Sequence, residues 1–117
     1  MTDILPFVAG LLEPLNAQTE LSFRSTRVTF PLIVLSVPSN SALTCGCEEI
    51  LSRITVQVDA YTRDKLMTMQ LAQSIDAIMT AHGFTRSIAQ PFTEGELERY
   101  MMQYSCVINY THNTIQN

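Results

Sequence analysis

The sequence predicts a single-domain α+β fold over residues 1–117, in the order α-β-β-α-β-β, with a four-stranded, largely antiparallel sheet and helices on one face. Apolar and polar residues alternate over 50–61 and again over 99–111, a pattern typical of half-buried strands. Between them, over 64–82, apolar residues recur at helical spacing. Two hairpins joined by a helix, with a short helix in front, suggest a layered α+β fold in which helices cover one face of a sheet. A chain of 117 residues is long enough for one hydrophobic core.

The first third of the chain predicts a short helix followed by an apolar strand. Thr2 or Asp3 can cap the helix, and Pro14 should end or bend it. After a polar stretch over 16–26, the segment 28–37 (VTFPLIVLSV) is rich in β-branched residues and favours a strand. Pro31 cannot donate a hydrogen bond to a neighbouring strand, which indicates a bulge or an outward-facing edge there.

The middle of the chain predicts a loop, a strand and the long helix. The segment 38–47 (PSNSALTCGC) is expected to be a loop. In the strand that follows, Arg53, Gln57 and Asp59 share the polar face. Thr62 or Asp64 can cap the long helix, and a glycine at position 83 suits its end.

The last third predicts a hairpin and a loose end. Residues 84–92 form a weaker strand candidate, 93–96 (TEGE) its turn, and 99–111 the final strand, with Met101 and Gln103 on the face opposite its tyrosines. The polar tail 112–117 is expected to be frayed.

Charge and composition argue against nucleic-acid recognition and for a partner. The formal net charge is −4, which offers no broad basic surface to phosphates. Charged residues make up 15% of the chain, against roughly 25% in typical soluble domains. Part of the surface is therefore expected to be covered by another protein.

The cysteines and the first residues indicate a soluble protein in a reducing compartment. Three cysteines form an odd set, and the two at 45 and 47 have no second pair with which to complete a four-ligand zinc site. Residues 1–15 lack a basic start and carry Pro6, Glu13 and Pro14, so neither a signal peptide nor a membrane span is expected.

Catalytic, metal and cofactor sites are not expected. His82 lies at the end of the long helix, and an enzyme using His82 with Asp76 or Tyr61 would need a geometry that a helix does not readily give. The acidic residues at 94, 96 and 98 lack the ligand pattern of a calcium loop. No phosphate-binding loop or hydrolase motif is present.

The apolar content of the predicted sheet suggests self-association. The strand over 28–37 is apolar on both faces, whereas two helices cover only one face of the sheet. Neighbouring copies of the chain are the economical cover, because most oligomers of one chain are closed and symmetric.

The chain resembles the tail terminator proteins of long-tailed bacteriophages, also called tail completion or tail-to-head joining proteins. The resemblance covers a leading helix, the apolar strand with FPLIV at 30–34, a variable loop, VQVDAYT at 56–62, a helix ending in HGF at 82–84, and a final strand opening at Arg99-Tyr100. The Cys-x-Cys loop departs from the family pattern.

The resemblance implies a homo-oligomeric ring, commonly of six subunits, at the head-proximal end of the virion tail, assembled in the cytoplasm of the bacterial host. Such a ring binds the tail tube protein, stops tube polymerisation and offers a surface to the head–tail connector proteins. DNA would pass through it without specific binding, which suits an acidic chain.

The ring suggests contact residues, each with a simpler alternative. The simpler alternative for the strand residues is a solvated sheet face, and for the residues at the helix start it is a solvated cap. Contacts between subunits or with the tube are expected at these residues: Arg53, Gln57, Asp59, Met101, Gln103, Arg63, Asp64 and Lys65. Loop contacts are expected at positions that could instead form a simple connector: Ser39, Asn40, Ser41, Leu43, Cys45, Cys47 and Glu48.

A second hypothesis remains open beside the ring. A small ligand-binding or regulatory α+β module could hold a metabolite on the uncovered sheet face and act as a dimer. That hypothesis requires convergent polar groups in a concave pocket.

Overall fold

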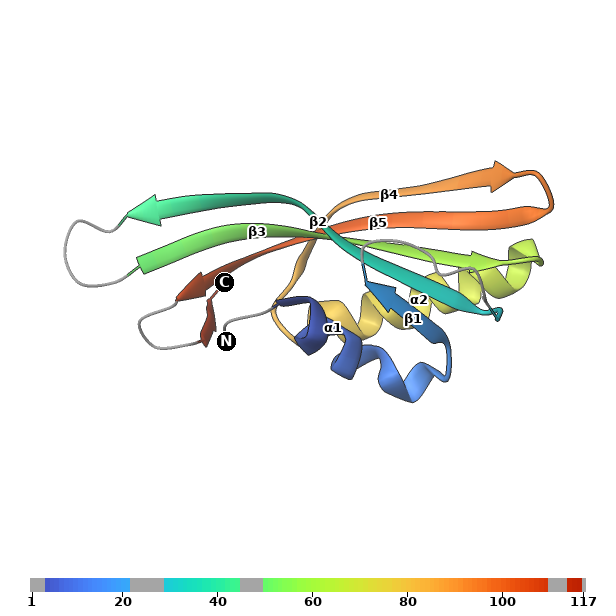
Figure 1. Ribbon diagram of the computed structural model, residues 1–117, viewed down its shortest axis with the longest axis horizontal. Coiled ribbons are helices and arrows are strands. Elements are labelled where there is room, and N and C mark those ends of the chain that lie inside the picture. The colour runs from blue at the N-terminus through green and yellow to red at the C-terminus, as the bar shows by residue number, and fades with distance from the viewer. Residues whose placement is uncertain (1–3, 22–28, 45–49, 110–113, 117) are drawn as a thin grey trace.

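A computed structural model describes residues 4–21, 29–44, 50–109 and 114–116. Its elements are α1 (Ile4–Leu12), the 3₁₀ turn η1 (Glu13–Leu15), β1 (Gln18–Leu21), β2 (Leu32–Thr44), β3 (Ile50–Thr62), α2 (Lys65–Ala81), β4 (Thr85–Glu94), β5 (Leu97–Asn109) and β6 (Thr114–Gln116). Figure 1 shows long strands above the two helices.

The predicted four-stranded, largely antiparallel sheet is wrong. The sheet is mixed and runs in the spatial order β1-β2-β3-β5-β4, and β6 pairs with the end of β5. β1 is parallel to β2, whereas the pairs β2–β3, β3–β5 and β4–β5 are antiparallel. The order of the main elements is therefore α-β-β-β-α-β-β.

β1 was missed because its sequence, QTEL, has no apolar periodicity. Its position depends on contacts with a distant segment. The backbone N–H of Gln18 donates to the carbonyl of Pro31 at 3.0 Å, and the Gln18 side-chain oxygen accepts from the backbone and hydroxyl of Thr29, both at 2.7 Å. Tertiary contacts of this kind override local propensity.

β2 begins and ends later than predicted. Pro31 precedes the strand, after a cis peptide bond with Phe30. The backbone of Ser39–Thr44, expected to be a loop, pairs with β3. The register shifts between Ser36 and Ser39, which places one extra residue on β2 beside Pro38. A bulge tolerates a proline, so the strand continues past it.

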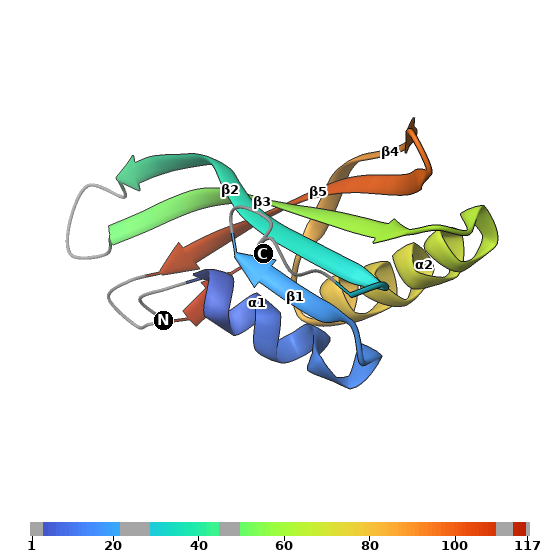
Figure 2. The ribbon, with the colours of Figure 1, turned by 45° about the vertical axis from the view of Figure 1, so that its right-hand side comes forward.

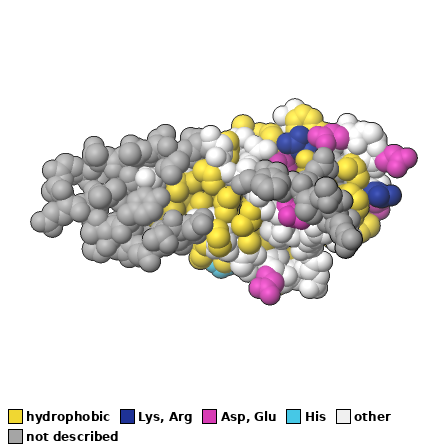
Figure 3. All heavy atoms as spheres, in the orientation of Figure 1, with side chains coloured by type: hydrophobic (Ala, Val, Ile, Leu, Met, Phe, Trp, Pro, Cys, Tyr) yellow, Lys and Arg dark blue, Asp and Glu magenta, His cyan; other side chains and the backbone are white. Residues whose placement is uncertain are grey.

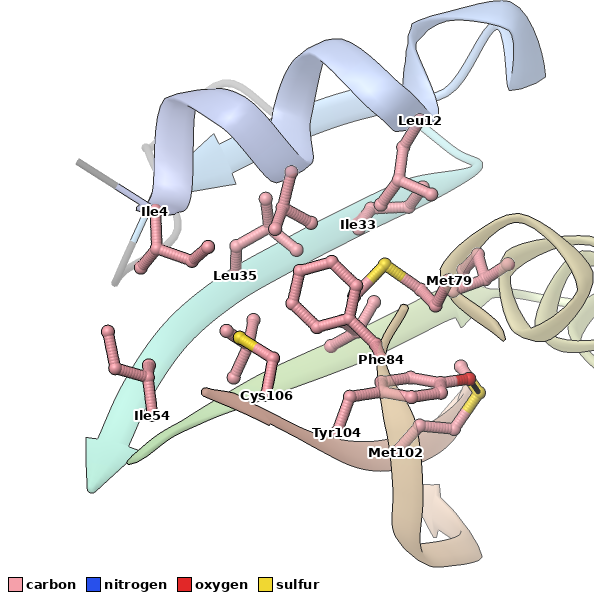
Figure 4. Packing of buried hydrophobic residues seen from close by; sticks show 14 of the residues in the cluster. Ile4, Leu12, Ile33, Leu35, Ile54, Met79, Phe84, Met102, Tyr104 and Cys106 are labelled. Carbon is pink, nitrogen blue, oxygen red and sulfur yellow. Dashed lines mark hydrogen bonds between the residues drawn. The ribbon is translucent and has the colours of Figure 1, made fainter. Parts of the chain in front are cut away.

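Both helices lie against the same face of the sheet, as the turned view in Figure 2 shows. The core between the layers joins residues of α1, α2 and the helix-facing positions of β2, β3 and β5. Figure 4 labels Ile4, Leu12, Ile33, Leu35, Ile54, Met79, Phe84, Met102, Tyr104 and Cys106 from this core. The predicted alternation is confirmed over 54–60 and 100–108, because every second residue there lies in this core or packs against it.

The long helix forms close to where the sequence placed it. Asp64 is its N-cap, and its carboxylate accepts a hydrogen bond from the backbone N–H of Leu66 at 3.2 Å. Thr62 adds hydrogen bonds to Asp64 and to the buried Thr68 hydroxyl. Gly83 follows the helix with φ of 91°, a conformation that glycine adopts without strain.

Replacing Asp64 with alanine should lower the free energy of unfolding by about 1 kcal/mol, because the first turn loses its side-chain cap. Asp64→Asn should retain most of the stability, and Lys65→Ala, one position along, should change it by less than about 0.5 kcal/mol. Urea denaturation of the three variants measures these differences. Equal losses in Asp64→Ala and Lys65→Ala would contradict the capping role.

The end of the chain is more ordered than the sequence suggested. Residues 114–116, part of the tail expected to be frayed, form β6 and pair with Val107, Ile108 and Asn109 of β5. Neither helix in the described part of the chain is long and apolar enough to cross a membrane.

The buried thiol of Cys106 should make stability fall at alkaline pH. Cys106 is 3% exposed, and burial raises its pKa to about 11. An unfolded thiol titrates near pH 8.5, so between about pH 8.5 and 11 only the unfolded chain releases this proton. Stability is therefore lost as the pH rises, by up to about 1.4 kcal/mol per pH unit.

Urea denaturation of the chain and of Cys106→Ala at pH 8, 9 and 10 isolates this contribution. The difference in unfolding free energy between the two proteins should shrink by about 1–2 kcal/mol over this range. A constant difference would show that the thiol does not contribute.

Candidate functional site

The sheet face opposite the helices, which we call the open face, gathers five of the predicted contact residues. Arg53, Gln57 and Asp59 lie on it in β3, and Met101 and Gln103 lie on it in β5. The register places Gln57 beside Gln103 and Asp59 beside Met101. Arg53 lies further along, paired with Val107, and its side chain is exposed.

A chain of polar contacts crosses the open face. The Gln103 amide donates to the Gln57 side-chain oxygen at 3.0 Å, and the Gln57 amide donates to Asp59 Oδ2 at 2.9 Å. The other Asp59 oxygen accepts from Nε of Arg99 at 2.9 Å, and Arg99 also donates to Glu94 at 3.0 Å. We call Gln103, Gln57, Asp59, Arg99 and Glu94 the polar network.

The ion pair in this network is shielded from water. Asp59 is 5% exposed, and the Arg99 side chain is 21% exposed. The Arg99 guanidinium also lies over the rings of Phe92 and Tyr61, at 5.1 and 5.9 Å from their centroids. Partial burial lowers the pKa of Arg99, but Asp59, Tyr61 and Glu94 outweigh it and leave the pKa raised. The guanidinium is thus held as a structural cation between strands.

Arg99 was not among the predicted contact residues, although its place in the alternating pattern was a weak signal. It shares an alternating position with Met101 and Gln103, so its face could be inferred. Its ion pair with Asp59, 40 residues earlier in the chain, could not be inferred from the sequence. Arg99 lies directly beside Tyr61 in the register and reaches Asp59 diagonally. The same diagonal reach is typical of long side chains on sheets.

The apolar part of the open face is largely covered within the chain itself. Leu32, Val34 and Tyr61 form a small cluster with Phe30 and Leu97, and Leu32 and Val34 are only 0% and 8% exposed. The expectation that these residues of β2 need a neighbouring copy to cover them is therefore wrong. Figure 3 shows charged side chains over the half of the molecule that holds α2 and the β4–β5 hairpin.

The predicted contact residues at the start of the long helix lie at the β3–α2 junction. Arg63 lies over the ring of Phe30, 5.1 Å from its centroid. Asp64 caps α2, and the exposed Lys65 begins it. Because these residues sit at one end of β3, the structure separates them from Arg53 at the other.

The predicted loop contacts divide between a strand and a segment outside the described residues. Ser39, Asn40, Ser41 and Leu43 belong to β2, where their backbone pairs with β3. Cys45, Cys47 and Glu48 lie outside the described residues.

The three residues considered for an enzyme are not brought together. His82 hydrogen-bonds through Nδ1 to the carbonyl of Ile78 at 2.9 Å, at the end of α2. Asp76 accepts the Tyr104 hydroxyl at 2.8 Å and lies 3.5 Å from Arg86. Tyr61 packs in the cluster on the open face.

The described part of the chain contains no group of three or more His, Cys, Asp or Glu residues placed to hold a metal ion. Comparison with protein-family models and with curated proteins finds no match to this chain.

Proposed function

We propose that this chain is a structural protein of a long-tailed bacteriophage or prophage that forms a six-subunit ring on the tail tube. The ring ends tube polymerisation and gives the head connector its attachment surface. The observation that supports this most is that two of the stretches behind the resemblance meet in space. Asp59, from VQVDAYT, forms the shielded ion pair with Arg99, from the Arg99-Tyr100 opening of the last strand.

The polar network would supply the rigidity that a ring subunit needs. Gln57 and Asp59 are engaged with Gln103 and Arg99, so they would fix the spacing of β3 and β5. Arg53, which is exposed on the same face, would be the residue that reaches a neighbouring subunit or the tube. A surface positioned by rigid strands loses little freedom on binding, which favours ordered assembly.

Termination would follow from two unlike sides of the ring. One side matches the last ring of the tube, and the other side does not match a further tube subunit, so polymerisation ends. With a charge of −4 on each copy, the ring would let DNA pass without holding its phosphates. The protein would then act at the head-proximal end of the virion tail, after assembly in the host cytoplasm.

Electron microscopy of particles made without this chain tests the proposal. Tails of uncontrolled length, or heads and tails left unjoined, are expected, and supplying the chain from a plasmid should restore joined particles. Plasmids carrying Arg53→Glu and Arg86→Glu compare two exposed arginines, one on the open face and one beside α2. Arg53→Glu should restore fewer joined particles than Arg86→Glu. Normal joined particles in the absence of the chain would refute the proposal.

A further inference from the structure

The strand β4 contributes no residue to the buried core of this fold. Nine of its ten residues are exposed, and Phe92 is half-buried. Figure 2 shows β4 beyond β5 at the edge of the sheet, and β5 is its one described strand neighbour. β4 is therefore held by its backbone pairing with β5 and by surface contacts, and not by the burial of apolar side chains.

The space between β4 and α2 contains two hollows. Pro91 of β4 lines a hollow of about 260 Å³ together with Met69 and Tyr100, and Arg86 lines a second hollow of about 80 Å³. The Arg86 side chain is 49% exposed and lies 3.5 Å from Asp76, its ion-pair partner on α2. Because an ion pair this exposed contributes little, α2 does not hold β4 in place.

Both ends of β4 are anchored more firmly than the strand itself. Phe84, just before β4, is 2% exposed in the core, and Leu97, after the turn, packs against the small cluster on the open face. The chain from Phe84 to Leu97 can reach about 43–47 Å. The part of β5 that pairs with β4, from Leu97 to Ser105, spans only about 27 Å. β4 can therefore leave β5 without displacing either anchor.

We infer that β4 is a detachable edge strand, which opens as one unit from Thr85 to Glu94 while β5 stays paired with β3. Opening breaks the ion pairs of Arg86 and Glu94 and leaves the core intact, since no β4 residue belongs to it. In the open state the outer edge of β5 is unpaired, and an extended chain can add a strand to such an edge. β4 thus acts as a removable cover of this edge.

The backbone of β5 distinguishes this opening from unfolding of the whole chain. Gly95 and Glu96 form a two-residue turn, so the Leu97 N–H faces Glu94, and the direction of the backbone groups alternates from there. The Ser87 hydroxyl agrees with this direction, because it donates to the Gln103 carbonyl at 3.2 Å. The amides that face β4, which we call the outer set, are those of Arg99, Met101 and Gln103. The amides that face β3, which we call the inner set, are those of Tyr100, Met102 and Tyr104.

Hydrogen exchange of the free chain, measured by NMR at several low urea concentrations, tests the opening. The outer set should exchange at least about tenfold faster than the inner set. Its rate should change little with urea, because opening β4 exposes little new surface, whereas the inner set should speed up as urea favours global unfolding. Equal rates and equal urea dependence of the two sets would overturn the inference.

The variant Ile75→Ala gives a second measurement. Ile75 is fully buried between α2 and the sheet, and it stays buried when only β4 opens. The variant should therefore accelerate the inner set by about 100-fold and the outer set less. Ser74→Ala, at an exposed position of the same helix, should leave both sets nearly unchanged. Equal acceleration of both sets in Ile75→Ala would show one common opening and contradict a separate motion of β4.

A disulfide that closes β4 onto β5 tests which element moves. Pro91 and Tyr100 form a pair without mutual backbone hydrogen bonds, whose Cα atoms lie about 4.5 Å apart, a distance that suits a disulfide. The double variant Pro91→Cys with Tyr100→Cys is made with Cys45 and Cys47 replaced by serine. In its oxidised form the two sets should exchange at similar rates, and reduction of the same protein should restore the difference. A difference that persists in the oxidised form would overturn the inference. Since the free chain is measured, this outcome does not depend on whether the proposed ring forms.

Discussion

Replacing Arg99 with alanine is expected to lower the free energy of unfolding by about 3 kcal/mol. In the intact protein Asp59 is 5% exposed, and without Arg99 its carboxylate keeps the Gln57 amide as its side-chain donor among the described residues. A largely buried charge without its ion-pair partner is costly. The substitution also removes the guanidinium from the rings of Phe92 and Tyr61. Urea denaturation followed by circular dichroism measures the loss.

Two further variants separate the ion pair from general effects of losing an arginine. Arg86→Ala removes an arginine whose side chain is 49% exposed and 3.5 Å from Asp76, and it should cost less than about 1 kcal/mol. The double variant Asp59→Ala with Arg99→Ala should be more stable than Arg99→Ala alone, because no buried charge remains without a partner. A double variant less stable than Arg99→Ala would contradict this account.

Replacing Ile75 with alanine is expected to lower the free energy of unfolding by about 3–4 kcal/mol. Ile75 is fully buried in the core between α2 and the sheet, and the truncation leaves a cavity there. Alanine is also the better helix former, so the observed loss slightly understates the packing contribution.

The adjacent residue provides the control for the helix itself. Ser74 is exposed, and Ser74→Ala should change stability by less than about 0.5 kcal/mol. Thermal denaturation of both variants compares the two positions on one helix turn. Similar midpoints for Ile75→Ala and the unmodified chain would show that α2 is not held to the sheet by this side chain.

Helices and strands in which apolar residues recur at regular spacing were predictable from the sequence. Strands that depend on contacts between segments far apart in the sequence were not. α2 and the faces of β3 and β5 follow from the spacing of apolar residues, because those residues enter one core. β1 has no such spacing, and it is a strand through its parallel pairing with Leu32–Leu35 of β2. The second half of β2 was hidden by Pro38, which reads as a strand terminator unless a bulge accommodates it.

The candidate site shows the same limit. The face of Arg53, Gln57 and Asp59 followed from alternation within β3. The partners of these residues did not, because a contact between Asp59 and Arg99 depends on the register of two strands separated by the whole of α2 and β4.

Among the described residues, β1 pairs with β2 from Leu32 to Leu35, so these four residues of β2 lie between two neighbouring strands. From Ser36 onward, β3 is the one described partner of β2. Backbone amides held between two strands exchange with solvent through larger openings than amides at an edge. Deuterium uptake should therefore be graded along this single strand, slow over Leu32–Leu35 and faster beyond the bulge toward Thr44.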